Sequence, residues 1–174
     1  MKIKLSYLIL TAFFFAITAA ATPRSTTRAT LTGNLDSTAS TVDLQRLPLV
    51  QDYRLWNSLA EFSATAVIFD RVGVLHGIHV FFFKVATGRW KAVLLVSSEE
   101  LSGRKNLLRR FGNITLNYNS DGVLISPHAS ILSRPITWIN HTHTKRIRIG
   151  LRGFTQFPAQ SDIFTWTMNG HGAK

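Results

Sequence analysis

The sequence of 174 residues contains no cysteine. Disulfide bonds and thiolate metal sites are therefore excluded, and cysteine usage says nothing about the redox compartment. Acidic residues are scarce, because 9 Asp and Glu stand against 20 Lys and Arg, which gives a formal net charge of +11. Such a charge favours acidic partners, namely nucleic acid, anionic lipid, cell-wall polymers or an acidic protein surface, and it does not choose among them.

Motifs for nucleotide binding and hydrolysis are also missing. The sequence has no phosphate-binding loop, no dinucleotide-binding glycine motif and no G-x-S-x-G. The spacing of His141 and His143 would place two rings on one face of a strand, but zinc needs three or four ligands. We therefore expect no enzyme activity, no cofactor and no bound metal.

Two aspartates precede turn glycines, Asp70 before Gly73 and Asp121 before Gly122. Aspartate side chains bond nearby backbone amides in turns. We interpret both residues as turn formers, and not as a catalytic pair.

The N-terminus has the layout of a secretory signal peptide. Lys2 and Lys4 precede an apolar run, which ends in the small residues Ala19–Ala21. We predict a helical signal peptide over residues 1–21, with an uncleaved anchor as the alternative. Membrane contact would then involve only residues 5–21. Residues 22–30 are rich in Thr, Ser and Arg and are predicted to be an exposed lead-in.

The rest of the chain has the material for one core, since 45% of residues are apolar and 17% are charged. Runs of β-branched and aromatic residues, separated by turn residues, are typical of antiparallel hairpins. The predicted strands are 64–69, 76–84, 89–96, 113–126 (a hairpin), 135–140, 146–151 and 162–169. Gly33 and Asn34 are interpreted as turn residues, and 97–112 as a long connection with one helical turn.

This pattern predicts an all-β fold, an antiparallel barrel or sandwich of roughly seven to nine short strands. We expect a single domain over residues 31–174. The central run Phe81–Phe83 is too short to span a membrane as a helix, for which about 20 residues are needed. It is predicted to be a core strand.

Basic residues form two clusters in the sequence. They could face an anionic partner, or they could be a solvated surface that aids solubility. The residues are Arg104, Lys105, Arg109, Arg110, Lys145, Arg146, Arg148 and Arg152.

Four blocks, in order, resemble the outer β-domain of bacterial flagellar hook proteins. The first is LTGNLDS, with Gly33, Asn34 and Asp36. The second is the stretch from Phe69 to Lys84, in which Asp70, Gly73 and His76 fall on matching positions and Trp90 follows.

The third block is LNYNSDGVL, with Asp121 and Gly122. The fourth is GFTQFPA, with Gly153, Thr155, Gln156 and Phe157. The resemblance covers about residues 30–174. It departs from the family at Arg71 and Val72, which replace Ser-Leu, and at Asn169 and His171, which replace Asp and Tyr.

The resemblance implies a structural domain with a role in flagellum assembly, without catalytic residues or a cofactor. The implied partners are other flagellar hook or basal-body subunits, and neither nucleic acid nor a specific small molecule. With the signal-like segment, it places the protein in the periplasm, in the flagellum or outside the cell. The alternative is a secreted, basic β-sandwich that binds an anionic polymer or an acidic protein.

Overall fold

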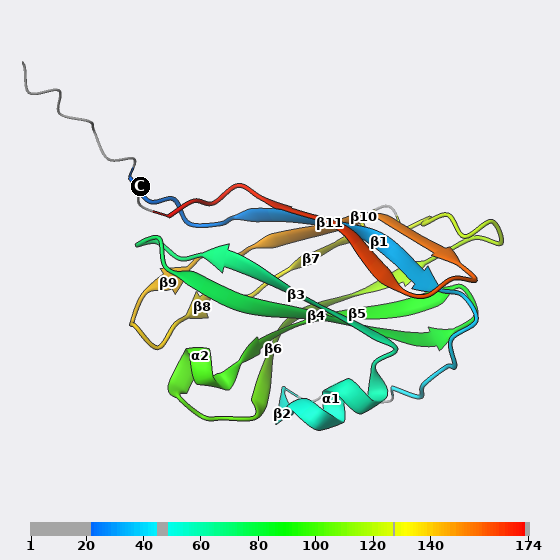
Figure 1. Cartoon of the computed structure of the whole chain (residues 1–174), viewed down its shortest axis with the longest axis horizontal. Coiled ribbons are helices and arrows are strands. Elements are labelled where there is room, and N and C mark those ends of the chain that lie inside the picture. The colour runs from blue at the N-terminus through cyan, green and yellow to red at the C-terminus, as the bar shows by residue number, and fades with distance from the viewer. Residues whose placement is uncertain (1–21, 45–48, 127, 173–174) are drawn as a thin grey trace, which may run out of the picture.

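The computed structural model describes residues 22–44, 49–126 and 128–172, and it consists mainly of two β-sheets packed face to face (Figure 1). The predicted signal segment, residues 1–21, lies outside the described residues. No helix in the described ranges is long and apolar enough to cross a membrane.

The larger sheet has five strands, and each neighbouring pair is antiparallel. Their order across the sheet is β2 (Val50–Asp52), β6 (Leu107–Asn117), β5 (Arg89–Ser97), β4 (Leu75–Ala86) and β3 (Phe62–Phe69). A tight turn joins β4 to β5, where Gly88 has a φ of 65°, whereas α2 (Ser98–Ser102) and a short loop lie between β5 and β6. These hairpins keep consecutive strands adjacent in space.

The second sheet has four strands in the order β11 (Asp162–Met168), β1 (Arg28–Asp36), β10 (Arg148–Phe157) and β7 (Ser130–Leu132). Here β1 lies between β10, to which it is parallel, and β11, to which it is antiparallel. The first and last strands of the domain are therefore direct neighbours. A small hairpin of β8 (Ile136–Thr137) and β9 (His143–Thr144) stands apart from both sheets.

The run Phe81–Phe83 has all three rings fully buried, because it packs on both faces of its sheet. Phe82 points into the space between the sheets, with its ring centroid 4.9 Å from that of Phe154 in β10. Phe81 and Phe83 point to the other face, where Trp56 of helix α1 (Tyr53–Leu59) covers them. The prediction of a core strand is confirmed.

The predicted all-β fold class is also confirmed, as a sandwich. The described residues contain eleven strands, more than predicted, because several have only two or three residues. Two helical segments accompany them, α1 and the short α2 (Ser98–Ser102).

Four local predictions were wrong. Gly33 and Asn34 lie inside β1, and not in a turn, because β10 and β11 pair with both sides of this segment. The exposed lead-in ends earlier than predicted, since Thr26 is fully buried and β1 begins at Arg28. The predicted connection 97–112 contains the first half of β6, and of the predicted strand 135–140 only Ile136 and Thr137 are β-strand.

Candidate functional site

The chain enters and leaves the sandwich at the same end (Figure 1). Arg24 and His171 exchange backbone hydrogen bonds of 2.9 and 3.0 Å. Thr26 donates its N–H to the Phe69 carbonyl, and its hydroxyl accepts the Phe69 N–H, both at 2.9 Å. We call residues 24–27 and 169–172 the stem. The stem is thus hydrogen-bonded to the end of β3.

A buried polar network lies directly behind this end. It links the β3–β4 turn, β4, α2 and the β8–β9 hairpin through side chains that contact the Asp70 carboxylate or the His76 ring. We call it the Asp70 cluster, and its members are Asp70, His76, Glu100, Trp138, Asn140 and Thr142.

Asp70 is fully buried, and both carboxylate oxygens accept several hydrogen bonds. Oδ1 accepts the N–H groups of Val72 and Val74, each at 2.9 Å, which fixes the turn. Oδ2 faces Nε2 of His76 at 3.1 Å and accepts Nδ2 of Asn140 at 3.0 Å and the Thr142 hydroxyl. The prediction of a turn former is confirmed at Asp70. The same carboxylate also bonds side chains from β4 and from the β8–β9 hairpin.

The His76 ring connects the cluster to two further elements. Its Nδ1 lies 2.8 Å from Oε2 of Glu100 in α2. Its face stacks on Trp138, with ring centroids 3.8 Å apart and planes inclined by 7°. Trp138 in turn donates Nε1–H to the Thr144 hydroxyl at 2.7 Å. One imidazole thus joins the helix, the turn and the small hairpin.

Burial alone would raise the pKa of the Asp70 carboxyl. The hydrogen bonds from Thr142, Asn140, the Val74 amide and His76 outweigh burial and hold this pKa well below its usual range. A carboxylate that must stay ionised and fully bonded is a fixed structural element. It is a poor candidate for a catalytic acid.

A second polar network lies where β10 ends. Gln156 accepts the Trp90 Nε1–H at Oε1 and donates its backbone N–H to the Gly122 carbonyl, both at 3.0 Å. Asn34 accepts the Phe157 N–H at 3.0 Å and the Thr155 hydroxyl at 3.1 Å, and donates to Ala159 O at 3.1 Å. We call these residues the distal cluster. It joins the 118–124 hairpin, β5, β1 and β10.

The remaining predicted motif positions lie in or beside these two networks. Gly73 donates its N–H to Asp70 O at 3.2 Å, Gly153 lies in β10 and Asp36 accepts the Thr38 N–H at 2.8 Å. Gly33 sits so close to Asp162 that a Cβ would overlap its carbonyl oxygen. Asp121 is exposed in its hairpin turn, where Asn119, and not Asp121, accepts the backbone amides. That these positions serve a function stays a prediction.

Sequence reasoning missed Glu100, Trp138, Asn140 and Thr142. The Asn140-His-Thr142 spacing has the form of a glycosylation acceptor, but both of its polar side chains bond Asp70 instead. Seventy residues separate Asn140 from Asp70. Local spacing gives no signal for such a contact.

The predicted basic residues do not form one surface. Arg104 and Arg109 line one hollow, Lys145 and Arg146 line a second, and Arg110 lines a third. Arg148 and Arg152 are exposed on β10, and Lys105 is exposed before β6. The sequence clusters are therefore spread over several elements.

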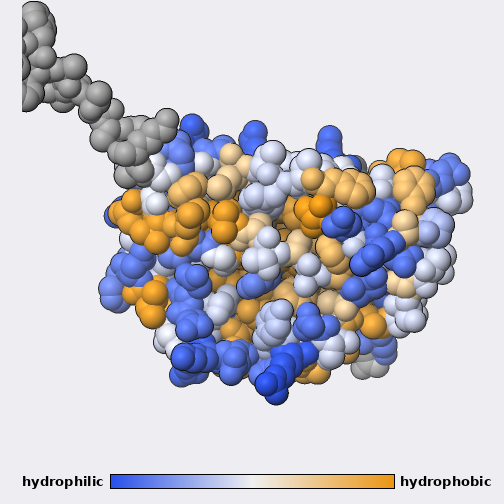
Figure 2. Space-filling view, in the orientation of Figure 1, coloured by the Kyte–Doolittle hydropathy of each residue, from blue (hydrophilic) through white to orange (hydrophobic). Residues whose placement is uncertain are grey.

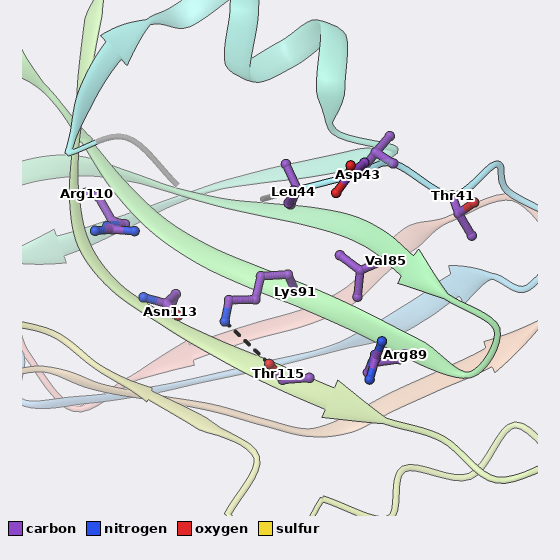
Figure 3. A pocket seen from close by; sticks show the side chains of 10 residues that line it. Thr41, Asp43, Leu44, Val85, Arg89, Lys91, Arg110, Asn113 and Thr115 are labelled. Atoms are coloured by element: carbon purple, nitrogen blue, oxygen red, sulfur yellow. Dashed lines mark hydrogen bonds between the residues drawn. The ribbon is translucent and has the colours of Figure 1, made fainter. Parts of the chain in front are cut away.

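The third hollow is a groove of about 830 Å³ on the outer face of the five-stranded sheet (Figure 3). Arg89 and Lys91 of β5 line this groove together with Arg110, and Lys91 donates to the Thr115 hydroxyl at 3.4 Å. Arg89 and Lys91 alternate with the buried Trp90 and Ala92, so strand periodicity could have found them. The groove can attract anions, since the described residues that line it include three cationic side chains and one acid, Asp43.

The described part of the chain holds no group of three or more His, Asp or Glu that could bind a metal ion. His143 bonds Thr137 through Nδ1 at 3.0 Å, on the small hairpin. His141 is in the turn of that hairpin, with a φ of 61°.

The chain is similar to known proteins over most of its length. A family model described as "Flagellar basal body protein FlaE D2 domain" matches residues 34–171. None of the curated proteins compared with the chain matches it.

Among solved structures, the chain is similar to a 32 kDa fragment of the flagellar hook protein FlgE from Caulobacter crescentus, with 15% identity and a TM-score of 0.48. The match covers 63% of this chain and 46% of the fragment, so the chain spans less than half of that fragment's length.

The Asp70 cluster predicts a pH-dependent stability. We expect Asp70→Asn to lower the free energy of unfolding by about 2–3 kcal/mol at neutral pH, since hydrogen bonds to charged groups contribute about 1.5–3 kcal/mol. The folded pKa of Asp70 is depressed, so its contribution is fully present above the unfolded value of about 3.9. It is lost as pH falls further, through the folded pKa.

Urea unfolding of both proteins between pH 3 and 8 measures this difference. Asp121→Asn is the matched control, because the Asp121 side chain makes no hydrogen bond to a described residue. A wild-type advantage that is the same at pH 3 and pH 8 would contradict the account.

The docking of the 118–124 hairpin predicts a second effect. Gly122 has a φ of 72°, and a Cβ there would overlap the Gln156 carbonyl oxygen, so Gly122→Val should destabilise the fold by several kcal/mol. A Cβ at Gly77 would meet no atom within 4 Å, so Gly77→Val should be tolerated. Melting temperatures of the two variants that fall equally would show that the hairpin docks differently.

Proposed function

Because the chain belongs to the flagellar basal body protein FlaE D2 domain family, we propose that it is a structural part of a flagellum that assembles with hook or basal-body subunits. The observation that carries this proposal is the extent of the family match. Residues 34–171 include the whole five-stranded sheet, three strands of the four-stranded sheet with the end of β1, the Asp70 cluster and the distal cluster. The match therefore covers most of the sandwich and reaches both of its sheets.

The stem supports a domain whose two ends join the same neighbouring structure. Entry and exit strands that are paired side by side let a domain project from a subunit without interrupting it. Asn169 accepts the N–H groups of Thr27 and Arg28, both at 3.0 Å, and so ties the exit to the entry. The resemblance predicts Asp at the position of Asn169. The side-chain oxygen of Asn169 accepts the same two backbone hydrogen bonds that an aspartate oxygen could accept.

An apolar surface surrounds the stem end and supports contact with another subunit. Val72, Val74 and Leu75 are 49%, 45% and 52% exposed at the β3–β4 turn. We call them the stem-end patch, and Figure 2 shows hydrophobic surface at this end of the molecule. Clustered apolar side chains on a protein surface are characteristic of interaction sites.

The comparisons do not favour the alternative of a secreted binding module. The family match also argues against an enzyme, because families of flagellar subunits act by assembly. Residues 1–21 lie outside the described residues, and export through a signal peptide is proposed from their sequence pattern alone. We propose that the protein acts outside the cytoplasm, as a flagellar component.

Purification of hook–basal bodies tests the proposal. We expect the native protein to co-purify with them, and a deletion strain to show impaired motility. Absence from the particles together with unchanged motility would contradict the proposal.

A variant with Val72, Val74 and Leu75 all changed to Ser should fold normally and associate at least about tenfold less, which corresponds to about 1.4 kcal/mol. The control changes Val123 and Ile125 to Ser, because these two are also exposed but lie in and beside the 118–124 hairpin. Equal loss in both variants would show that the stem-end patch has no special part in assembly.

A further inference from the structure

The groove on the outer face of the five-stranded sheet has the size of a binding site (Figure 3). Its volume of about 830 Å³ falls within the range of about 300–1,000 Å³ that ligand sites occupy. None of its described lining residues belongs to the Asp70 cluster, the stem or the stem-end patch. The groove is therefore a separate surface, which the contacts proposed above leave unused.

One side of the groove carries a line of positive charge. Arg89 and Lys91 lie two residues apart on β5. Arg110 of β6 lies opposite Leu95, six residues along β5 from Arg89. Because a strand rises about 3.3 Å per residue, the three cations follow a line of about 20 Å. Neither guanidinium group forms an ion pair with a described carboxylate. Charges spread over this length suit an elongated ligand better than a single small anion.

The other side of the groove is apolar and held in place. Val42, Leu44 and Val85 line it and pack against the smaller of the two core clusters. Val42 donates its N–H to Lys84 O at 2.8 Å. The buried Nζ of Lys84 donates to Ser37 O at 2.6 Å. The segment that forms this wall is thus tied to β4, and the groove is part of the folded domain.

We propose that the groove binds an extended segment of another protein in which acidic and apolar residues alternate. Side chains of an extended chain point alternately to opposite sides. The acidic ones would face Arg89, Lys91 and Arg110, and the apolar ones would face the opposite wall. Acidic residues two apart repeat at the same distance as Arg89 and Lys91, and about seven residues span the 20 Å line. The one acid in the groove, Asp43, leaves a surplus of 3 − 1 = 2 positive charges.

The sequence of this chain excludes a second copy as the ligand. Glu99 and Glu100 are its only acidic residues fewer than seven positions apart. They are adjacent, so in an extended segment they point to opposite sides and only one can face the cations. A second copy also brings a net charge of +11 to a positive surface. Binding at the groove is independent of the flagellar role proposed above, because it uses no residue of the stem end.

A synthetic peptide of alternating Glu and Val, about seven to nine residues long, tests the alternation. The control peptide has the same composition, with all Glu before all Val, so its charge is the same. We expect the alternating peptide to bind the purified protein roughly tenfold more tightly in titration calorimetry at physiological ionic strength. Equal affinity of the two peptides, or no binding of either in the millimolar range, would overturn the proposal.

Charge removal tests the position of the site. In a variant with Arg89→Gln and Lys91→Gln, the alternating peptide should bind at least about fivefold more weakly, since one exposed ion pair contributes up to about fivefold in affinity. The matched control, Arg104→Gln with Lys105→Gln, removes the same two residue types from exposed positions outside the groove. The control should bind the peptide like the wild type. Equal loss in both variants would show that net charge, and not the groove, attracts the peptide.

Two further ligands test whether the occupant is a peptide of this kind. Polygalacturonate, a polymer of acidic sugars, offers negative charge without apolar side chains, and so does the alternating peptide with Ser in place of Val. We expect both to bind more weakly than the original peptide and to lose binding as salt is added. Polygalacturonate that binds more tightly than the peptide would assign the groove to a carbohydrate. A Ser peptide that binds as tightly as the original would overturn the role of the apolar wall.

Discussion

The Asp70 carboxylate is the constraint on which the arrangement of the stem end depends. A buried carboxylate is tolerated only when its oxygens are fully bonded. Asp70 meets this requirement with groups from its own turn, from β4 and from the β8–β9 hairpin. The turn it fixes places Phe69 where Thr26 can bond it, and Thr26 belongs to the stem. Local turn chemistry and the position of the chain ends are thus coupled.

The fold class was predictable because its signals are local. Alternating side chains and turn glycines located the central strands, and the all-apolar run Phe81–Phe83 identified the strand that is buried on both faces. The turn predicted at Gly33 and Asn34 is a strand instead, because residue types that favour turns also allow close packing. Here Gly33 lies against Asp162, and Asn34 uses its side chain to bridge β1 and β10.

The candidate site was only half predictable, for a related reason. Asp70 and His76 lie in one hairpin, so their importance could be recognised from the sequence. Asn140 and Thr142 come from a hairpin far along the chain, and only the fold brings them to Asp70. The beginning of β6 was missed because Arg109 and Arg110 gave it the composition of a connection. Tertiary pairing overrides such local preferences.

These features together describe a two-sheet sandwich whose entry and exit segments are bonded side by side at one end. The claim at the centre of this account is that the Asp70 cluster fixes the stem. Native-state hydrogen exchange of the Arg24, Thr26 and His171 amides, in the wild type and in Asp70→Asn, measures it directly. We expect protection in the wild type and selective loss in the variant, with the distal Gln156 amide unchanged. Stem amides that exchange freely in the wild type, or equally in both proteins, would contradict the account.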